Sequence, residues 1–169
     1  MTLESFGKKM KYLQIAYPSF KLELDNPMHI EVWYDILGEF EDNYFNTILK
    51  DYTKHNEYAP NSPASIIAWA KQMILRNVDM GSKFDKLIQR LRADIYDVDK
   101  VAEKYEKGGQ SAMAKVVREL SVDVEMWRYD SAQLPFLKNK FEKTYQHYLQ
   151  LEVDKNVFSI TDPSRLLGE

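Results

Sequence analysis

Three histidines and several closely spaced acids are the side chains with which this chain could bind a metal or transfer a proton. His29, His55 and His147 stand alone, because none has a second histidine at a spacing that would place two metal ligands on one helix face. The acid pairs three residues apart are Glu39 with Asp42 and Asp94 with Asp97. They fall in polar helix ends, where carboxylates usually cap the helix or stay hydrated. We therefore predict no metal site and no catalytic residue, so that the protein is not an enzyme.

The positions of the glycines exclude a P-loop, the glycine-rich loop that binds nucleotide phosphates. A phosphate-binding loop needs closely spaced glycines followed by a lysine and a hydroxyl residue, so that backbone N–H groups converge on the phosphates. The chain has six glycines, of which only Gly108 and Gly109 are adjacent, and the required lysine does not follow them. We predict that the protein is not a P-loop ATPase and binds no cofactor.

Composition points to an intracellular globular protein. Cysteine is absent, which excludes disulfides, thiolate metal sites and a cysteine nucleophile. No run of eighteen apolar residues is present, and the first residues lack the basic-then-apolar layout of a signal peptide. We therefore expect a cytoplasmic location and no membrane partner.

The charge distribution of the chain does not favour nucleic-acid binding. The net charge of −3 lies in residues 1–80, which hold 8 Lys and Arg against 11 Asp and Glu, whereas residues 81–169 hold 15 of each. Basic residues between Lys83 and Arg92 are flanked by Asp85 and Asp94, which is typical of a hydrated helix face. Direct nucleic-acid binding is left open by the sequence.

The secondary-structure elements that hold these side chains in place are predicted to be α-helices. The predicted fold class is therefore all-α. Apolar residues recur at spacings of three and four, and only 6 glycines and 6 prolines interrupt 169 residues that include 22 aromatic side chains. The expected helices cover about 2–17, 27–38, 42–55, 63–76, 84–95, 98–107, 113–120, 121–127 and 135–153. Ser121 is expected to cap the eighth. Only residues 20–24 show a trace of strand-like alternation.

The chain is expected to form two helical parts. Turn formers between Asn77 and Ser82 suggest a boundary, with an N-terminal helical domain at 1–76, a C-terminal helical subdomain at 82–153 and a loosely ordered tail at 154–169. One N-terminal core is predicted from the apolar stripes: Trp33, Ile36, Leu37, Phe45, Leu49, Ile66 and Ile67.

Several sequence motifs follow one another between residues 17 and 66. They are Tyr17-Pro18-Ser19-Phe20, Val32-Trp33-Tyr34-Asp35-Ile36-Leu37, Tyr52, and the stretch from Tyr58 to Ile66. In this order they resemble the replicative-helicase loader/inhibitor family of phages that infect Gram-positive bacteria. The second half is also similar to longer relatives in Trp127, Phe141 and Tyr145. It departs from them at Glu106-Lys107-Gly108-Gly109, where relatives often carry Leu-Pro.

The resemblance implies a DNA-replication adaptor in the host cytoplasm. Such proteins bind a hexameric replicative DNA helicase, inhibit it and/or load it at the origin, and work with a replication initiator protein and single-stranded DNA, so a single-stranded-DNA-binding protein is a further partner to consider. Whether the helicase is viral or from the host is open. The family has no catalytic residues to transfer to this sequence.

Four aromatic residues of the second half are candidates for the partner contact: Tyr96, Tyr105, Trp127 and Tyr129. Tyr and Trp are enriched in interface hot spots, although packing inside a subdomain is the alternative use for them. Two other functions stay open, a helix-turn-helix DNA-binding regulator and a small helical enzyme with a site assembled across helices. The acidic first half disfavours the regulator, and no residue pattern marks an enzyme.

Overall fold

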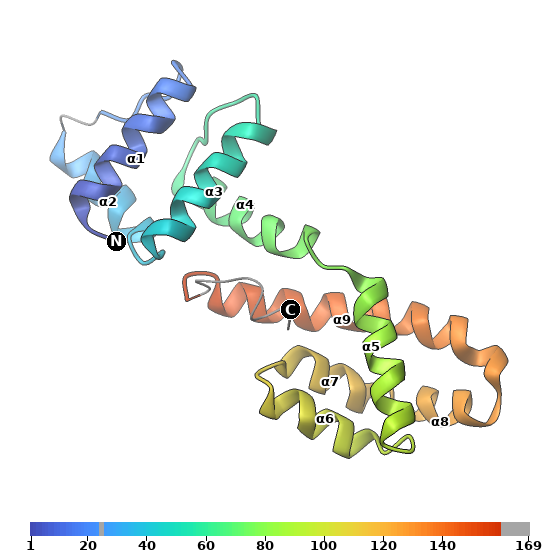
Figure 1. The fold of residues 1–169 in the computed structure, drawn as a ribbon. Helices are drawn as coiled ribbons and strands as arrows, with labels where there is room; N and C mark the ends of the chain where they lie inside the picture. The colour runs from blue at the N-terminus through green and yellow to red at the C-terminus, as the bar shows by residue number, and fades with distance from the viewer. Residues whose placement is uncertain (24–25, 160–169) are drawn as a thin grey trace. The chain divides into compact units, whose positions relative to one another are not determined.

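The computed structural model describes residues 1–23 and 26–159, and over these residues the protein is all-α, as predicted (Figure 1). Nine α-helices and one 3-10 turn make up the regular structure of these two ranges, and the described part of the 20–24 segment contains no strand. The elements are α1 (Leu3–Ala16), α2 (Pro27–Leu37), α3 (Asp42–His55), α4 (Pro63–Arg76), α5 (Met80–Ala93), α6 (Val98–Lys107), α7 (Ser111–Glu119), α8 (Ser121–Tyr129), η1 (Ser131–Gln133) and α9 (Leu134–Asn156).

The described chain divides into two compact units. Unit 1 comprises residues 1–74 together with 156–159, and unit 2 comprises residues 75–155. The domain limits 1–76 and 82–153 stay a prediction, because contacts alone do not show that either part folds independently. Helix α9 continues to Asn156, past the expected end at Val153, and residues 160–169 of the predicted loose tail lie outside the described residues.

Helix boundaries in unit 1 follow local chemistry. The Thr2 side chain accepts a hydrogen bond from the backbone N–H of Ser5 and caps α1. That helix ends before Pro18, because the residue preceding a proline disfavours helical dihedrals. Pro27 opens α2 behind the capping side chain of Asn26. The Tyr17–Phe20 motif therefore lies at the end of α1 and in the connector to α2, and the Val32–Leu37 motif lies in α2 itself.

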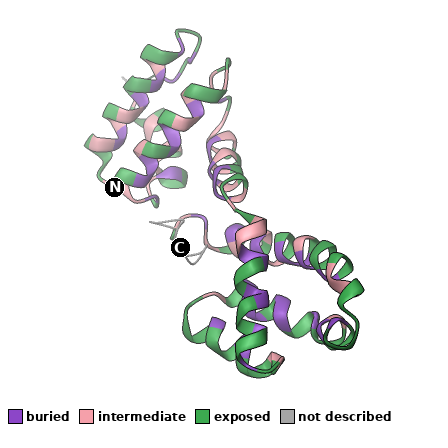
Figure 2. Ribbon diagram, turned by 45° about the vertical axis from the view of Figure 1, so that its right-hand side comes forward, coloured by how far each residue is buried: buried purple, intermediate pink, exposed green. Residues whose placement is uncertain are grey.

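Stacked aromatic rings form the centre of unit 1, where α1 packs against α2 and α3. The ring of Phe45 lies 6.0 Å from that of Phe6 and 5.7 Å from that of Phe40, centroid to centroid, and all three residues are fully buried. Figure 2 shows the buried segments on the inward faces of these helices. Such rings contribute area burial and a favourable offset geometry.

The predicted N-terminal core is correct for four residues and wrong for three. Leu37, Phe45, Leu49 and Ile66 are buried, whereas Ile36 is 40% exposed and Trp33 and Ile67 are half-buried. The physical reason is that α2 buries only its end: Leu37 is the one buried residue of that helix, and Phe40 follows it in the turn. Periodicity identifies an apolar stripe, but the neighbouring helix decides how much of it is covered.

Unit 2 is built from α5 to α9. Phe84 of α5 contacts Phe141 of α9 with ring centroids 5.4 Å apart, and Phe141 stacks on Tyr145 at 5.6 Å. Helix α6 packs against both α5 and α7, and α7 against α8. The Lys104 ammonium donates to both carboxylate oxygens of Asp94, at 2.5 and 2.7 Å, and so fastens α6 to the end of α5.

Two expected details of unit 2 are corrected by the structure. Helix α5 ends at Ala93, so Ile95 is not on its apolar stripe; Ile95 and Tyr96 adopt φ of 57° and 62°, and Ile95 is 76% exposed. Ser121 does not cap α8, because it is already the first helical residue and Leu120 joins α7 directly to α8. Two consecutive non-glycine residues with left-handed backbone angles, Ile95 and Tyr96, are not predictable from a simple sequence pattern. The same holds for Leu120, which ends α7 and also precedes the first residue of α8.

Candidate functional site

Helix α8 carries apolar residues on two opposite faces. Leu120, just before it, and Val124 and Trp127 within it are buried at spacings of four and three, and these residues hold the helix to unit 2. Residues two positions away from these lie on the other side, because two residues turn an α-helix by about 200°. A helix that is apolar on both sides normally has both sides covered. Here one side has no cover among the described residues.

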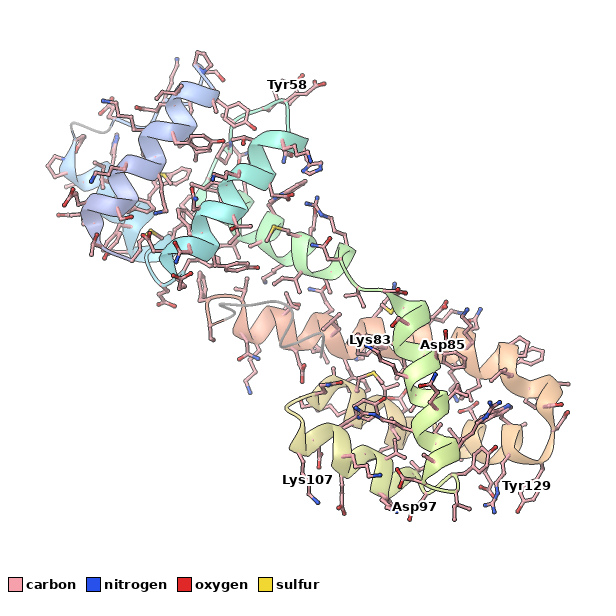
Figure 3. All side chains as sticks on the ribbon, viewed as in Figure 1. Tyr58, Lys83, Asp85, Asp97, Lys107 and Tyr129 are labelled. Atoms are coloured by element: carbon pink, nitrogen blue, oxygen red, sulfur yellow. The ribbon has the colours of Figure 1, made fainter. Side chains whose placement is uncertain are left out.

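The uncovered side of α8 is a regular stripe of large side chains. Val122 is 68% exposed, Met126 52% and Tyr129 78%, and their spacings of four and three place them in one row. Asp123 and Glu125 flank the row, and their charges are matched by Lys140 at 2.7 Å and Arg128 at 3.7 Å. Figure 3 shows Tyr129 at the end of α8.

Tyr96 extends this surface from the turn between α5 and α6. Its ring meets the Trp127 indole edge to face, with centroids 5.2 Å apart. The guanidinium of Arg128 lies 5.7 Å from the Tyr96 ring centre and 5.6 Å from that of Tyr129, and therefore bridges the two rings. We define the α8 surface as Val122, Met126, Tyr129 and Tyr96.

The four aromatic candidates fall into two pairs. Tyr129 is exposed and Tyr96 is half-buried, so both rings are open to a partner. Trp127 is 5% exposed and Tyr105 2% exposed, so these two rings act in packing. Burial raises the pKa of the Tyr105 hydroxyl, and the Arg90 guanidinium lies 4.2 Å from its ring centre. The structure therefore joins Tyr96, Trp127 and Tyr129 and separates Tyr105 from them.

A second candidate surface is an open groove of about 590 Å³ in unit 1. Its apolar lining includes Phe20, Val32, Trp33 and Tyr58, and the Phe20 and Trp33 rings meet edge to face at 5.4 Å. Tyr58 is 80% exposed and projects from the loop between α3 and α4 (Figure 3). We call this feature the unit 1 groove.

The groove was not foreseen from the sequence, although the motifs that line it were. Ser19-Phe20, Val32-Trp33 and Tyr58-Ala59-Pro60-Asn61 are distant in sequence, and all contribute to its lining. In the sequence, these motifs served to indicate the family resemblance. Tyr58 in a polar loop was the available sequence signal, because exposed aromatic residues are enriched at binding surfaces.

Residues 1–23 and 26–159 contain neither a candidate metal centre nor a membrane-spanning helix. There, no cluster of three His, Cys, Asp or Glu side chains is placed to hold a metal ion. His29 Nδ1 lies 3.4 Å from a Glu23 carboxylate oxygen, and His55 Nδ1 lies 2.9 Å from the Asp51 carbonyl oxygen. Within the same ranges, no helix has the length and apolar character needed to cross a bilayer.

Comparison with known proteins gives a family match at the N-terminal end. Residues 1–67 match the family model for the N-terminal domain of the helicase loader of phage SPP1. The matched region contains α1 to α3, the start of α4 and every residue that lines the unit 1 groove. No curated protein and no solved structure matches the chain.

Proposed function

We propose, from the premise that residues 1–67 belong to the N-terminal domain family of a phage helicase loader, that this protein is a replication adaptor that binds a hexameric replicative helicase. The family is one of non-catalytic adaptors. The domain match is the observation that carries the proposal. Binding is proposed to inhibit the helicase, to load it at the origin, or both.

The α8 surface is our proposed helicase contact. It combines an exposed apolar row with an aromatic and an arginine side chain, Tyr129 and Arg128, which are residue types enriched in interface hot spots. The flanking charges are already matched within unit 2, so an approaching protein would cover the row without leaving an unpaired charge. The surface lies outside the matched residues 1–67, in the second half of the chain, where the aromatic candidates for the partner contact were predicted.

A non-catalytic protein can regulate a helicase through differential affinity. The hexamer changes its subunit surfaces with nucleotide state, and a ligand that binds one state more tightly shifts the population toward that state. The adaptor therefore needs only a surface that fits one of those states. The α8 surface supplies complementarity of this kind without any reacting group.

A helix-turn-helix regulator is supported less well. A recognition helix reads DNA through exposed polar and basic side chains and needs cations near the phosphates. The exposed row of α8 is Val122, Met126 and Tyr129, and the charges beside it include Asp123 and Glu125. We therefore favour a protein partner over a duplex.

The proposal is tested by identifying the partner. An affinity-tagged full chain is incubated with extract of a Gram-positive bacterium before and after phage infection, and retained proteins are identified by mass spectrometry. We expect a replicative helicase, which is then purified and titrated against the full chain. Failure of both viral and host helicases to bind would contradict the adaptor function. Retention that disappears on nuclease treatment would instead favour nucleic acid as the bridge.

A further inference from the structure

The unit 1 groove has the chemistry of a peptide-binding site. Aromatic side chains from three separate segments, Phe20, Trp33 and Tyr58, line it, and its volume of about 590 Å³ lies within the range of about 300–1,000 Å³ usual for ligand pockets. Open grooves lined by aromatic residues suit extended segments, whose backbone carbonyls are free to accept hydrogen bonds. The groove therefore has both the shape and the apolar area for an extended chain.

Two aromatic donors at the groove have no partner among the described residues. The Trp33 indole N–H and the Tyr58 hydroxyl make no hydrogen bond there, although the Tyr58 carbonyl accepts one from Tyr52. Trp and Tyr at interfaces usually satisfy such groups while covering the apolar ring. Carbonyl oxygens of a bound segment would satisfy both donors.

The charge of the groove differs from that of the region around it. Among the described residues, the ionisable side chains that line the groove are Lys21, His29 and Tyr58, with no Asp or Glu, and Glu23 lies beside the lining at 3.4 Å from His29 Nδ1. Residues 1–80 nevertheless carry a net charge of −3. Lys21 is exposed and makes no ion pair with any described residue. An acidic side chain on the bound segment would therefore be favoured.

We propose that the unit 1 groove binds an extended segment of a partner protein that is both apolar and acidic. This binding site goes beyond helicase contact, because it lies on a different unit from the α8 surface. A single lysine in the lining disfavours single-stranded nucleic acid, which requires cations along the whole backbone path.

The test is a selection of peptides on the full-length protein. A displayed library of random eight-residue peptides is selected on the wild type, and the selected peptides are then measured by fluorescence anisotropy. We expect enrichment in Asp and Glu together with Pro and large apolar residues. Tyr58→Ala and Trp33→Ala should each weaken binding at least tenfold, and Lys21→Glu should weaken the acidic peptides and favour basic ones.

Matched controls separate the groove from the rest of unit 1. Ile15→Ala removes another exposed apolar side chain, 75% exposed and outside the groove, and Lys11→Glu reverses another exposed lysine. Neither should change affinity. Because Tyr58 is exposed, the Tyr58→Ala protein should keep the wild-type melting temperature, so lost binding cannot come from unfolding.

Three results would overturn the proposal. Selected peptides that are neutral or basic would contradict the charge argument, and peptides that bind Tyr58→Ala and Trp33→Ala as tightly as wild type would place the site elsewhere. Tighter binding of an oligo-dT strand than of any selected peptide, abolished by Lys21→Glu, would make the groove a nucleic-acid site. None of these measurements uses a helicase, so failure here is distinguishable from failure of the adaptor function.

Discussion

The ring of Tyr96 packs edge to face on the indole of Trp127, with their centroids 5.2 Å apart, and thereby joins the turn after α5 to helix α8. Trp127 is buried and Tyr96 is half-buried, so the contact anchors the Tyr96 ring against unit 2. Pre-organised side chains lose less entropy when a partner binds. The contact therefore reduces the entropy that the Tyr96 ring would lose when a partner covers it.

Removing the exposed row of α8 should weaken helicase binding without changing stability. For Tyr129→Ala we expect a loss of about 2 kcal/mol, or roughly thirtyfold in Kd, as for a hot-spot tyrosine. Met126→Ala should also weaken binding, whereas Leu151→Ala serves as control because its side chain is 50% exposed against 52% for Met126. Titration calorimetry with the helicase checks this. Equal losses for Met126→Ala and Leu151→Ala would exclude a specific role for α8.

Replacing Ile95 by glycine should stabilise the protein. The φ of 57° places this β-branched residue in the left-handed region, at a cost of about 1–2 kcal/mol that glycine does not incur. Its side chain is 76% exposed, so little packing is lost. We expect a gain of about 1 kcal/mol in the free energy of unfolding by urea denaturation. A destabilised Ile95→Gly protein would show that the isoleucine side chain packs in solution.

The ion pair at the end of α5 should make stability depend on acid pH. Hydrogen bonds from Lys104 and then Lys100 hold the pKa of the Asp94 carboxyl below its ordinary 3.8. The carboxylate therefore contributes stability above pH 3.8, and this contribution is lost as the pH falls through the lower folded-state pKa. Asp94→Asn should lower the melting temperature at pH 7, and the difference from wild type should shrink below pH 3.8.

Thermal unfolding across the pH range supplies the measurement, with Glu103→Gln as the matched variant. Glu103 also pairs with a lysine, Lys107, but at 3.4 Å and on the surface, so its loss should have little effect. If both variants behaved alike, the Asp94 pair would have no special role.

Truncation in unit 1 should distinguish the real core from the predicted one. Phe45 is fully buried between two other rings, and Phe45→Ala should cost about 3–5 kcal/mol of the free energy of unfolding. Ile36 is 40% exposed, and Ile36→Ala should cost far less. Chemical denaturation of the full chain is sufficient. If both variants lost a similar amount of unfolding free energy, Ile36 would have to be part of the core.

The isolated protein should not hydrolyse ATP, yet its helicase affinity should respond to nucleotide. No phosphate-binding glycine loop occurs in the sequence, so phosphate release by purified protein should equal the buffer blank. Selection of one helicase state should make Kd differ between helicase with an ATP analogue and helicase without it. Identical Kd values would remove the state-selection mechanism, and steady ATP turnover would contradict the adaptor function.

The sequence by itself determined the helices, because apolar spacing and proline positions act locally. Pro18, Pro27 and Pro63 mark a helix end and two helix starts, and the structure has all three at those places. The resemblance to a helicase-loader family was also readable from residues 17–66, and the family match covers them. The two predicted core residues on α3, Phe45 and Leu49, are both buried, so periodicity alone identified the inward face of that helix.

Only the tertiary structure decided which apolar side chains stay exposed. Val124 and Met126 are similar in sequence context, but Val124 is buried and Met126 is not, because the described helices of unit 2 pack on one side of α8 only. The unit 1 groove likewise required segments around 20, 33 and 58 to meet. Burial depends on contacts with residues that are distant in the chain, and the spacing of apolar residues within one helix does not reveal those contacts.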